Sequence, residues 1–406
     1  MFSLKAFPIH TKYVIFSNLY MNKPKRVFYV LFIASVVTNI GSGMIAALLG
    51  VYSKTLGATG LQLGVIYSGI SIARAILSPP VGKLSDARGR KAFLVFGLLA
   101  YTLISLGYIY AKTVYGLIVV GLLHGAAAAF VLPVAFAYIG DITPEGKEGQ
   151  YLGTFGISLF VGWAIGPIIG GVIADLFGYK EAFLSMGILS LTSLIITSFM
   201  LPGGRIIRKS KNPISYKSLL KDRLLVVILS VRFLHLLTIS SLMTFVPIFA
   251  KSISLSLSQV GTVLMLNILV MGLLQHPFGR LADKTNRINM LVIGGIIASA
   301  GLIGIPFSSN FWQLLFWNMV MAVGSAISFP ATNAIVTVKG RDSGMASVMA
   351  IFNFAMSAGM AIGPLIAGAI YDVMGLGWVF GVLSVISALG LVLFYPYMKK
   401  SPSPSF

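Results

Sequence analysis

The chain has no cysteine and only ten acidic residues among its 406 positions. Without cysteine, the protein has no disulfides, thiolate metal sites or thiol nucleophiles. Charged residues of both signs make up 10% of the chain, whereas hydrophobic residues make up 57% and the mean hydropathy is +0.93. A water-soluble domain has more charge and less apolar surface than this. The chain therefore needs a lipid bilayer as its solvent.

Twelve apolar segments are long enough to cross a bilayer as helices, which takes roughly 20 residues each. Strands of a membrane barrel would be shorter and would alternate in polarity, so we expect an all-α membrane protein. Little of the chain remains for a soluble domain. The expected helices are residues 27–52, 61–81, 92–111, 114–138, 151–175, 181–201, 224–250, 257–279, 289–309, 311–335, 345–370 and 375–397.

The net charge of +20 is explained by topology rather than by a nucleic-acid partner, because all but six of the 30 basic residues fall in the tails and in alternate loops. Such an excess is typical of cytoplasmic segments. We expect a multi-pass protein of the cytoplasmic membrane with both termini in the cytoplasm and no nucleic-acid partner. The exceptions are Lys54, Lys112, Lys180 and Lys251 in the opposite loops, and Arg74 and Arg232 within helices.

The sequence repeats itself at an offset of 197 residues without a gap. Six helices separate the copies, so both enter the membrane from the same side and we expect two parallel six-helix bundles. The equivalent pairs include Asp86 and Asp283, Arg90 and Arg287, Pro133 and Pro330, Gly166 and Gly363, and Asp175 and Asp372. The expected parts are a tail 1–26, a bundle 27–201, a basic linker 202–223, a bundle 224–397 and a tail 398–406. Met21 is a plausible translation start, and residues 1–20 are expected to be dispensable.

The loop after the second helix carries a specific motif, Gly82-Lys83-Leu84-Ser85-Asp86-Ala87-Arg88-Gly89-Arg90-Lys91. It resembles the signature loop of the major facilitator superfamily, and Gly279, Asp283 and Arg287 belong to a weaker copy after the eighth helix. The resemblance covers about residues 27–397. It implies two six-helix bundles, one central site and alternating access by rocking of the halves.

Asp86, Arg90 and Asp141 are expected to form a charge cluster at the inner surface. The resemblance implies that this cluster also engages the eleventh expected helix, residues 345–370, and latches the outward-facing state, since a helix N-terminus favours a carboxylate. The alternative is that these charges only set the topology.

The fifth helix carries Gly162, Gly166, Pro167, Gly170 and Gly171, which resemble a G-x-x-x-G-P-x-x-G-G motif of the family's exporters and antiporters. The expected helix 345–370 repeats much of it with Gly359, Gly363, Pro364 and Gly368. Small residues at this spacing let helices approach closely, so simple packing is an alternative to any directional meaning.

Arg74 and Arg232 lie near the middle of the membrane, where a charge costs roughly 2.5–3.5 kcal/mol on insertion scales. Asp175 and Asp372 lie near the outer helix ends, so the arginines have no evident counter-ion and an anionic solute would supply one. Tyr67 and Ser71 share a helix face with Arg74, and His235 shares one with Arg232. The alternative for Arg74 is that it snorkels or binds carbonyls.

The histidines are the only groups within the spans whose ordinary pKa lies near neutral pH, so proton coupling would run through His124, His235 or His276. Drug:proton antiporters of the family carry an arginine near this part of helix 4, whereas this chain has His124-Gly125. That difference weighs against standard proton antiport. Asn39, Asn267 and Gln275 are further candidates for polar contacts with a solute, or for interhelical packing.

These features predict a secondary transporter for a small organic solute, anionic or amphipathic, with efflux favoured over uptake. The alternative within transport is an organic-anion uptake or exchange carrier that uses Arg74 and Arg232. A membrane enzyme or receptor would need clustered acid, base or metal ligands, which the sequence does not suggest. There is no phosphate-binding loop, so the energy comes from a gradient. We expect no cofactor and a monomer.

Overall fold

The computed structural model describes residues 10–144, 147–202, 221–343 and 345–400, and these residues form helices with no strand among them. Twelve helices are long and apolar enough to span a membrane, as the sequence predicted. The N-terminal six are α1 His10–Thr55, α2 Gly60–Arg88, α3 Arg90–Tyr110, α4 Val114–Ile142, α5 Glu148–Leu176 and α6 Tyr179–Met200. The C-terminal six are α8 Arg223–Ser252, α9 Leu257–Lys284, α10 Arg287–Gly304, α11 Phe311–Ser343, α12 Met345–Met374 and α13 Leu376–Lys400, with a short 3₁₀ turn η1 Ile305–Phe307.

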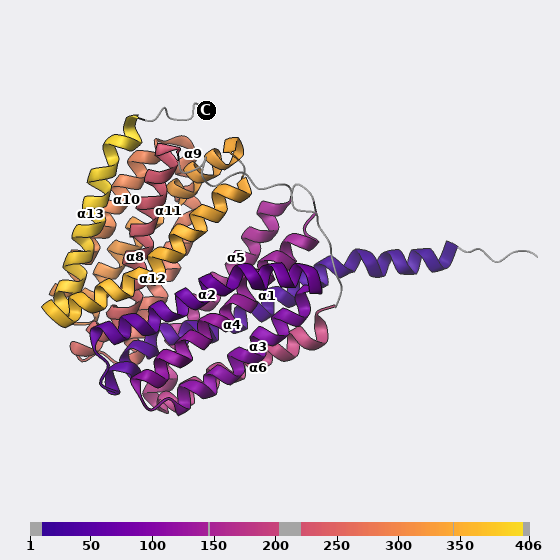
Figure 1. Cartoon of the computed structure of the whole chain (residues 1–406), viewed down its shortest axis with the longest axis horizontal. Coiled ribbons are helices and arrows are strands. Elements are labelled where there is room, and N and C mark those ends of the chain that lie inside the picture. The colour runs from indigo at the N-terminus through magenta and orange to yellow at the C-terminus, as the bar shows by residue number, and fades with distance from the viewer. Residues whose placement is uncertain (1–9, 145–146, 203–220, 344, 401–406) are drawn as a thin grey trace, which may run out of the picture.

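The helices form two bundles, α1–α6 and α8–α13, which meet at one end and diverge toward the other (Figure 1). We call the end at which α2 and α9 begin the closed end. The opposite end, at which α1 begins and α13 finishes, is the open end. The first turns of α1 project beyond the bundle there, so α1 starts well before the helix 27–52 that hydropathy predicted. Most of the expected basic linker 202–223 lies outside the described residues.

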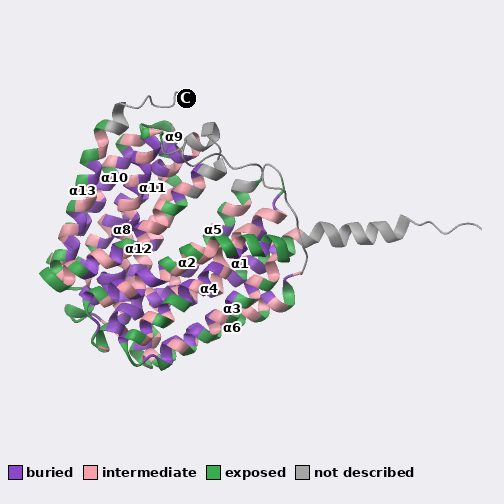
Figure 2. Cartoon of the chain, in the orientation of Figure 1, coloured by how far each residue is buried: buried purple, intermediate pink, exposed green. Residues whose placement is uncertain are grey.

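Hydrophobic packing explains why the bundles part at one end. One large core cluster contains residues of both bundles, including Leu48, Leu63, Phe245 and Val260. Two smaller clusters belong to one bundle each, around Val134 in the N-terminal bundle and around Ile228 in the C-terminal bundle. Figure 2 shows buried residues inside each bundle and where the bundles meet. The shared core therefore holds the halves together at the closed end only.

Two helix pairs carry most of the contact between the bundles: α2 packs on α12, and α5 packs on α9. Glycines allow the close approach. A Cβ on Gly64 would lie 2.9 Å from the Cα of Leu365, and one on Gly261 would lie 2.7 Å from the Cα of Ile168. Both distances are shorter than real Cβ contacts, so these positions accept only glycine without a shift of the backbone.

The helices that begin at this interface start with the same capping box. Thr59 and Gln62 cap the N-terminus of α2, and Ser256 and Gln259 cap that of α9. In each box the hydroxyl accepts a hydrogen bond from the glutamine backbone, and the glutamine side chain accepts one from the cap backbone. The two boxes are 197 residues apart, so the internal repeat seen in the sequence extends to the local structure.

Candidate functional site

Arg74 lies on α2 where the two bundles begin to part. Its Nη2 reaches across to the sulfur of Met360 on α12, in the other bundle, at 3.7 Å. Within its own bundle it lies in electrostatic range of Tyr101 on α3 and His124 on α4. Ser78, one turn further along α2, donates its hydroxyl to the backbone carbonyl of Arg74 at 2.6 Å. The guanidinium therefore occupies the junction between bundles rather than a membrane surface.

Arg232 is almost fully buried in the C-terminal bundle, with 2% of its surface exposed. Its guanidinium carbon lies 4.2 Å from the ring centre of Phe329 and 5.5 Å from that of Phe352, so two aromatic faces contribute cation–π stabilisation. Nη2 lies 3.9 Å from the sulfur of Met356. Its Nε has no hydrogen-bond partner. The two phenylalanine rings and the methionine sulfur stabilise the guanidinium less than the hydrogen bonds to water that it loses on burial.

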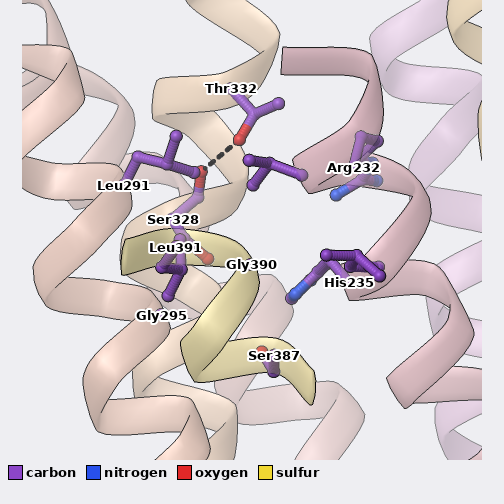
Figure 3. Close-up of a pocket in the computed structure, with 11 residues that line it drawn as sticks. Arg232, His235, Leu291, Gly295, Ser328, Thr332, Ser387, Gly390 and Leu391 are labelled. Atoms are coloured by element: carbon purple, nitrogen blue, oxygen red, sulfur yellow. Dashed lines mark hydrogen bonds between the residues drawn. The ribbon is translucent and has the colours of Figure 1, made fainter. Parts of the chain in front are cut away.

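Arg232 and His235 point from α8 into a pocket between α8, α10, α11 and α13 (Figure 3). Leu291, Gly295 and Leu391 give the pocket apolar walls, and Ser328, Thr332 and Ser387 add hydroxyl groups. Thr332 donates its hydroxyl to the backbone carbonyl of Ser328 at 2.9 Å. The Nε2 of His235 is buried without a partner. The pocket thus holds two nitrogen groups that protein atoms leave unsatisfied.

The two arginines come from different bundles and converge on α12. Met360 contacts Arg74 and Met356 contacts Arg232, so the contacts lie four residues apart, about one helical turn along α12. In the part of the chain that the structure describes, the ion pairs involve Arg90, and neither of these arginines meets a carboxylate. The sequence predicted two isolated positive charges, and the structure brings them to neighbouring turns of one helix.

The other predicted substrate residues have varied surroundings. Tyr67 and Gln275 are partly buried, and the Tyr67 hydroxyl and the Gln275 amide nitrogen have no partner. Asn39 donates to the backbone carbonyl of Ser35 within α1 at 2.7 Å, and Asn267 joins α9 to α11 by donating to that of Asn318 at 3.0 Å. Two further residues are buried in the N-terminal bundle: Ser71 on α2, and His124, whose ring lies 5.0 Å from that of Tyr101.

The signature loop forms the charge cluster that the sequence suggested. Arg90 pairs with Asp86, and its Nε donates to the carboxylate of Asp141 at 3.0 Å. The third contact of Arg90 is a hydrogen bond from Nη1 to the hydroxyl of Ser85 at 2.8 Å. Gly89 makes the turn between α2 and α3 with a φ of 96°, a conformation that favours glycine, and Lys91 is partly exposed beside it. With this end open, the Asp86 side chain is 62% exposed, and its latching role stays a prediction.

The second copy of the loop is weaker in sequence. Within the described residues, Arg287 donates its Nε to the backbone carbonyl of Ala282 at 3.2 Å. The side chain of Asp283 lies outside the described residues. Gly279, like Gly82 in the first copy, has open space where a Cβ would stand.

The glycine motif of α5 divides into two roles. Gly162 and Gly166 face α1 within the same bundle, where a Cβ on Gly162 would lie 2.5 Å from the Cβ of Asn39. Gly171 instead faces the backbone of Leu257 on α9, and Pro167 lies against Gly261 of the same helix. The copy in α12 divides in the same way, since Gly363 faces Leu237 on α8, whereas Pro364 meets Gly64 and Gly368 meets Gly60 on α2.

Asp175 and Asp372, which lie near helix ends, join the two bundles by hydrogen bonds that the sequence did not predict. The carboxylate of Asp372 accepts hydrogen bonds from the backbone N–H groups of Gly60 at 2.5 Å and Leu61 at 2.7 Å. That of Asp175 accepts from Leu257 at 3.0 Å and Ser258 at 2.7 Å. Both contacts join one bundle to the other. Their repetition at the 197-residue offset was the signal that could have found them.

Comparisons with known proteins agree with this architecture. A model of the Major Facilitator Superfamily matches residues 31–233 and 228–405. An uncharacterised MFS-type transporter of Methanocaldococcus jannaschii is 32% identical over 388 residues, which cover 94% of this chain and 100% of that protein. The multi-drug resistance efflux pump PmrA homolog of Lactococcus lactis is 25% identical over 364 residues, 85% of this chain and 88% of that one.

Among solved structures, the nucleoside transporter NupG has the same fold, with a TM-score of 0.77 and 16% identity over 92% of this chain and 100% of that chain. The family model covers nearly the whole of both bundles. This chain is a member of the Major Facilitator Superfamily, a secondary transporter and not an enzyme.

Proposed function

We propose that this transporter exports amphipathic organic solutes that carry an anionic group, and that Arg74 and Arg232 bind that group. The observation that carries the proposal is the convergence of both guanidinium groups on successive turns of α12, with no carboxylate beside them in the described part of the chain. A buried charge without a partner is unfavourable, so an anion that reaches both guanidinium groups gains two charge-assisted contacts.

The position of the two arginines also links binding to movement. Arg74 belongs to the N-terminal bundle, whereas Arg232 and α12 belong to the C-terminal bundle. When the bundles rock, Arg74 changes its distance from Arg232 and Met360, and the affinity for an anion changes with it. A solute drives such a transition only through its different affinity for the two states. His235, Tyr67 and Ser71 are the further side chains that we assign to this site, and Gln275 supplies an amide from α9.

The proposed direction of transport, export, is supported by the name of a relative and by a motif of this chain. The Lactococcus lactis relative is named as a multi-drug resistance efflux pump, and α5 of this chain carries the exporter-like glycine motif. The excess of basic residues in the loops at the open end supports cytoplasmic termini, so the open end faces the cytoplasm and receives the solute there. We further propose the cytoplasmic membrane as the location and a monomer as the working unit.

The proposal is tested with purified protein in liposomes, using pairs of fluorescent solutes that differ only in a carboxylate and its methyl ester. Arg74→Gln is expected to lower the apparent affinity for the acid about tenfold and to leave the ester unchanged, which corresponds to about 1.4 kcal/mol. Arg74→Lys retains part of the affinity because its point charge remains while bidentate geometry is lost. Equal effects of Arg74→Gln on acid and ester would contradict the proposed role.

A proton gradient is the proposed energy source, with a histidine of the spans as the coupling group. His235 lies in the pocket with Arg232, His124 lies in the core of the N-terminal bundle, and His276 is exposed on α9. Transport measured with and without an imposed proton gradient, in the parent chain and in His235→Gln, tests this. Equal transport rates with and without the proton gradient would show that transport is not coupled to protons.

A further inference from the structure

We propose that Asp175 and Asp372 are a matched pair of positioning residues that hold the closed end shut, each by capping the first helix turn of the opposite bundle. The inference concerns the transport cycle and does not depend on which solute is carried. We call the two contacts the inter-bundle caps: Asp372 of α12 on α2, and Asp175 of α5 on α9.

Each inter-bundle cap satisfies groups that a helix leaves free. The first backbone N–H groups of a helix have no partner within it and carry the positive end of its dipole. Thr59 and Ser256 satisfy the N–H of the third residue in their helices. The aspartates take the two N–H groups that the capping boxes leave, those of Gly60 and Leu61 in α2 and of Leu257 and Ser258 in α9. Four hydrogen bonds to ionised oxygens result.

These bonds exist only while the bundles touch. The donors of each inter-bundle cap lie on one bundle and its carboxylate on the other, so separation of the closed end breaks all four at once. Helix N-termini and carboxylates would then meet water or lipid headgroups. Because the aspartate and the capping box recur at the 197-residue offset, the two caps sit in equivalent places on either side of the pseudo-twofold axis and resist opening symmetrically.

The hydrogen bonds of the inter-bundle caps require a close approach of the helix backbones, of α12 to α2 and of α5 to α9. A Cβ on Gly60 would lie 2.8 Å from the carboxylate oxygen of Asp372, and Gly368, one turn earlier on α12, packs against the backbone of Gly60. Gly171, one turn before Asp175, packs in the same way against Leu257. The aspartate side chain is short, so it reaches the N–H groups only because glycine allows this approach. A glutamate would be one methylene too long for the same contact.

The absence of cysteine makes the test direct, because spin labels can be attached to introduced cysteines alone. Tyr115 and Trp312 are equivalent by the repeat, begin α4 and α11 at the closed end, and are each 73% exposed. Leu84 and Leu281 form the matching exposed pair at the open end. Distances are measured by electron spin resonance in Tyr115→Cys/Trp312→Cys and in Leu84→Cys/Leu281→Cys, each with and without Asp175→Asn and Asp372→Asn.

Each substitution is expected to lower the ratio of closed to open molecules at the closed end about fivefold, and both together about 25-fold, if each charge contributes about 1 kcal/mol. The Tyr115–Trp312 distance lengthens while the Leu84–Leu281 distance shortens, since one face opens as the other shuts. Glu181→Gln is the control, because it removes one exposed carboxylate from the first turn of α6 at the same end.

Ser258→Pro provides a second route that keeps the carboxylate and removes one of its donors, since proline is tolerated in the first turn of a helix. It is expected to reproduce the shift of Asp175→Asn. Unchanged distances in the double aspartate variant and in Ser258→Pro would overturn the proposal. So would an equal shift in Glu181→Gln, or a broadening of both distances without reciprocity, which would indicate general loss of stability.

Discussion

Replacement of Gly171 by alanine is expected to favour opening of the closed end. The added Cβ would overlap the backbone carbonyl oxygen of Leu257 on α9 and lie 2.9 Å from the backbone nitrogen of Ser258. Backbone atoms do not rotate aside as a side chain does, so the two bundles must move apart at this point. Overpacking of this kind costs about 1–3 kcal/mol. Because this clash arises where the closed end brings Gly171 against Leu257, we expect the penalty to fall on the closed arrangement.

A penalty of 1–3 kcal/mol changes a two-state ratio by about 5–150-fold. Thr244 on α8 reports this ratio, since it is fully buried and its backbone oxygen would lie 3.0 Å from a Cβ on Gly50 of α1. In a Thr244→Cys chain, which has no other thiol, the rate of maleimide labelling in detergent measures how often the closed end opens. Gly171→Ala is expected to raise that rate by the same factor and to lower transport turnover.

Another glycine of the α5 motif provides the control for Gly171→Ala. Gly162 lies in the same helix, but a Cβ there would meet Asn39 and Ile40 of α1 within the bundle. Gly162→Ala should therefore reduce the amount of folded protein without favouring either state. A Cβ on Gly153 has open space, so Gly153→Ala should be neutral. If Gly171→Ala left the labelling rate of Thr244→Cys unchanged, or if Gly162→Ala raised it equally, the assignment of Gly171 to the bundle interface would be refuted.

Further predictions concern the charges and the N-terminal segment. Asp86→Asn should lower transport about fivefold with near-normal abundance in the membrane, because the side chain is exposed and the predicted latch acts on one conformational state; a parallel loss of abundance, measured by immunoblot, would contradict this. Arg232→Gln should weaken binding of an anionic solute and Arg232→Lys should retain part of it; lowered abundance with unchanged affinity would instead indicate a structural arginine. Deletion of residues 1–20 should leave transport unchanged, because the first span, Pro24–Thr55, stays intact; loss of the protein from the membrane would count against it.

Local sequence was sufficient to predict much of the fold of this protein. The twelve spans follow from hydropathy, because a bilayer requires long apolar helices whatever they pack against. The repeat at 197 residues predicted two parallel bundles. The signature loop, together with Asp141, predicted the charge cluster at the open end. Asp86 lies in the last turn of α2 and Arg90 begins α3, four residues later. Their pairing therefore depends on where α2 ends and on the Gly89 turn, not on distant parts of the chain.

Contacts between distant helices were decided by the tertiary structure. Hydropathy does not specify which face of α12 meets α2 and which meets α8, so the convergence of Arg74 and Arg232 on Met360 and Met356 could not be read from the sequence. Gly162 and Gly171 belong to one motif, yet packing directs the first to α1 and the second to α9. In the sequence, Asp175 and Asp372 were recognisable only as a repeated pair near helix ends. Their role requires N–H groups more than 80 and 300 residues away, which only the docking of the two bundles brings within hydrogen-bonding distance.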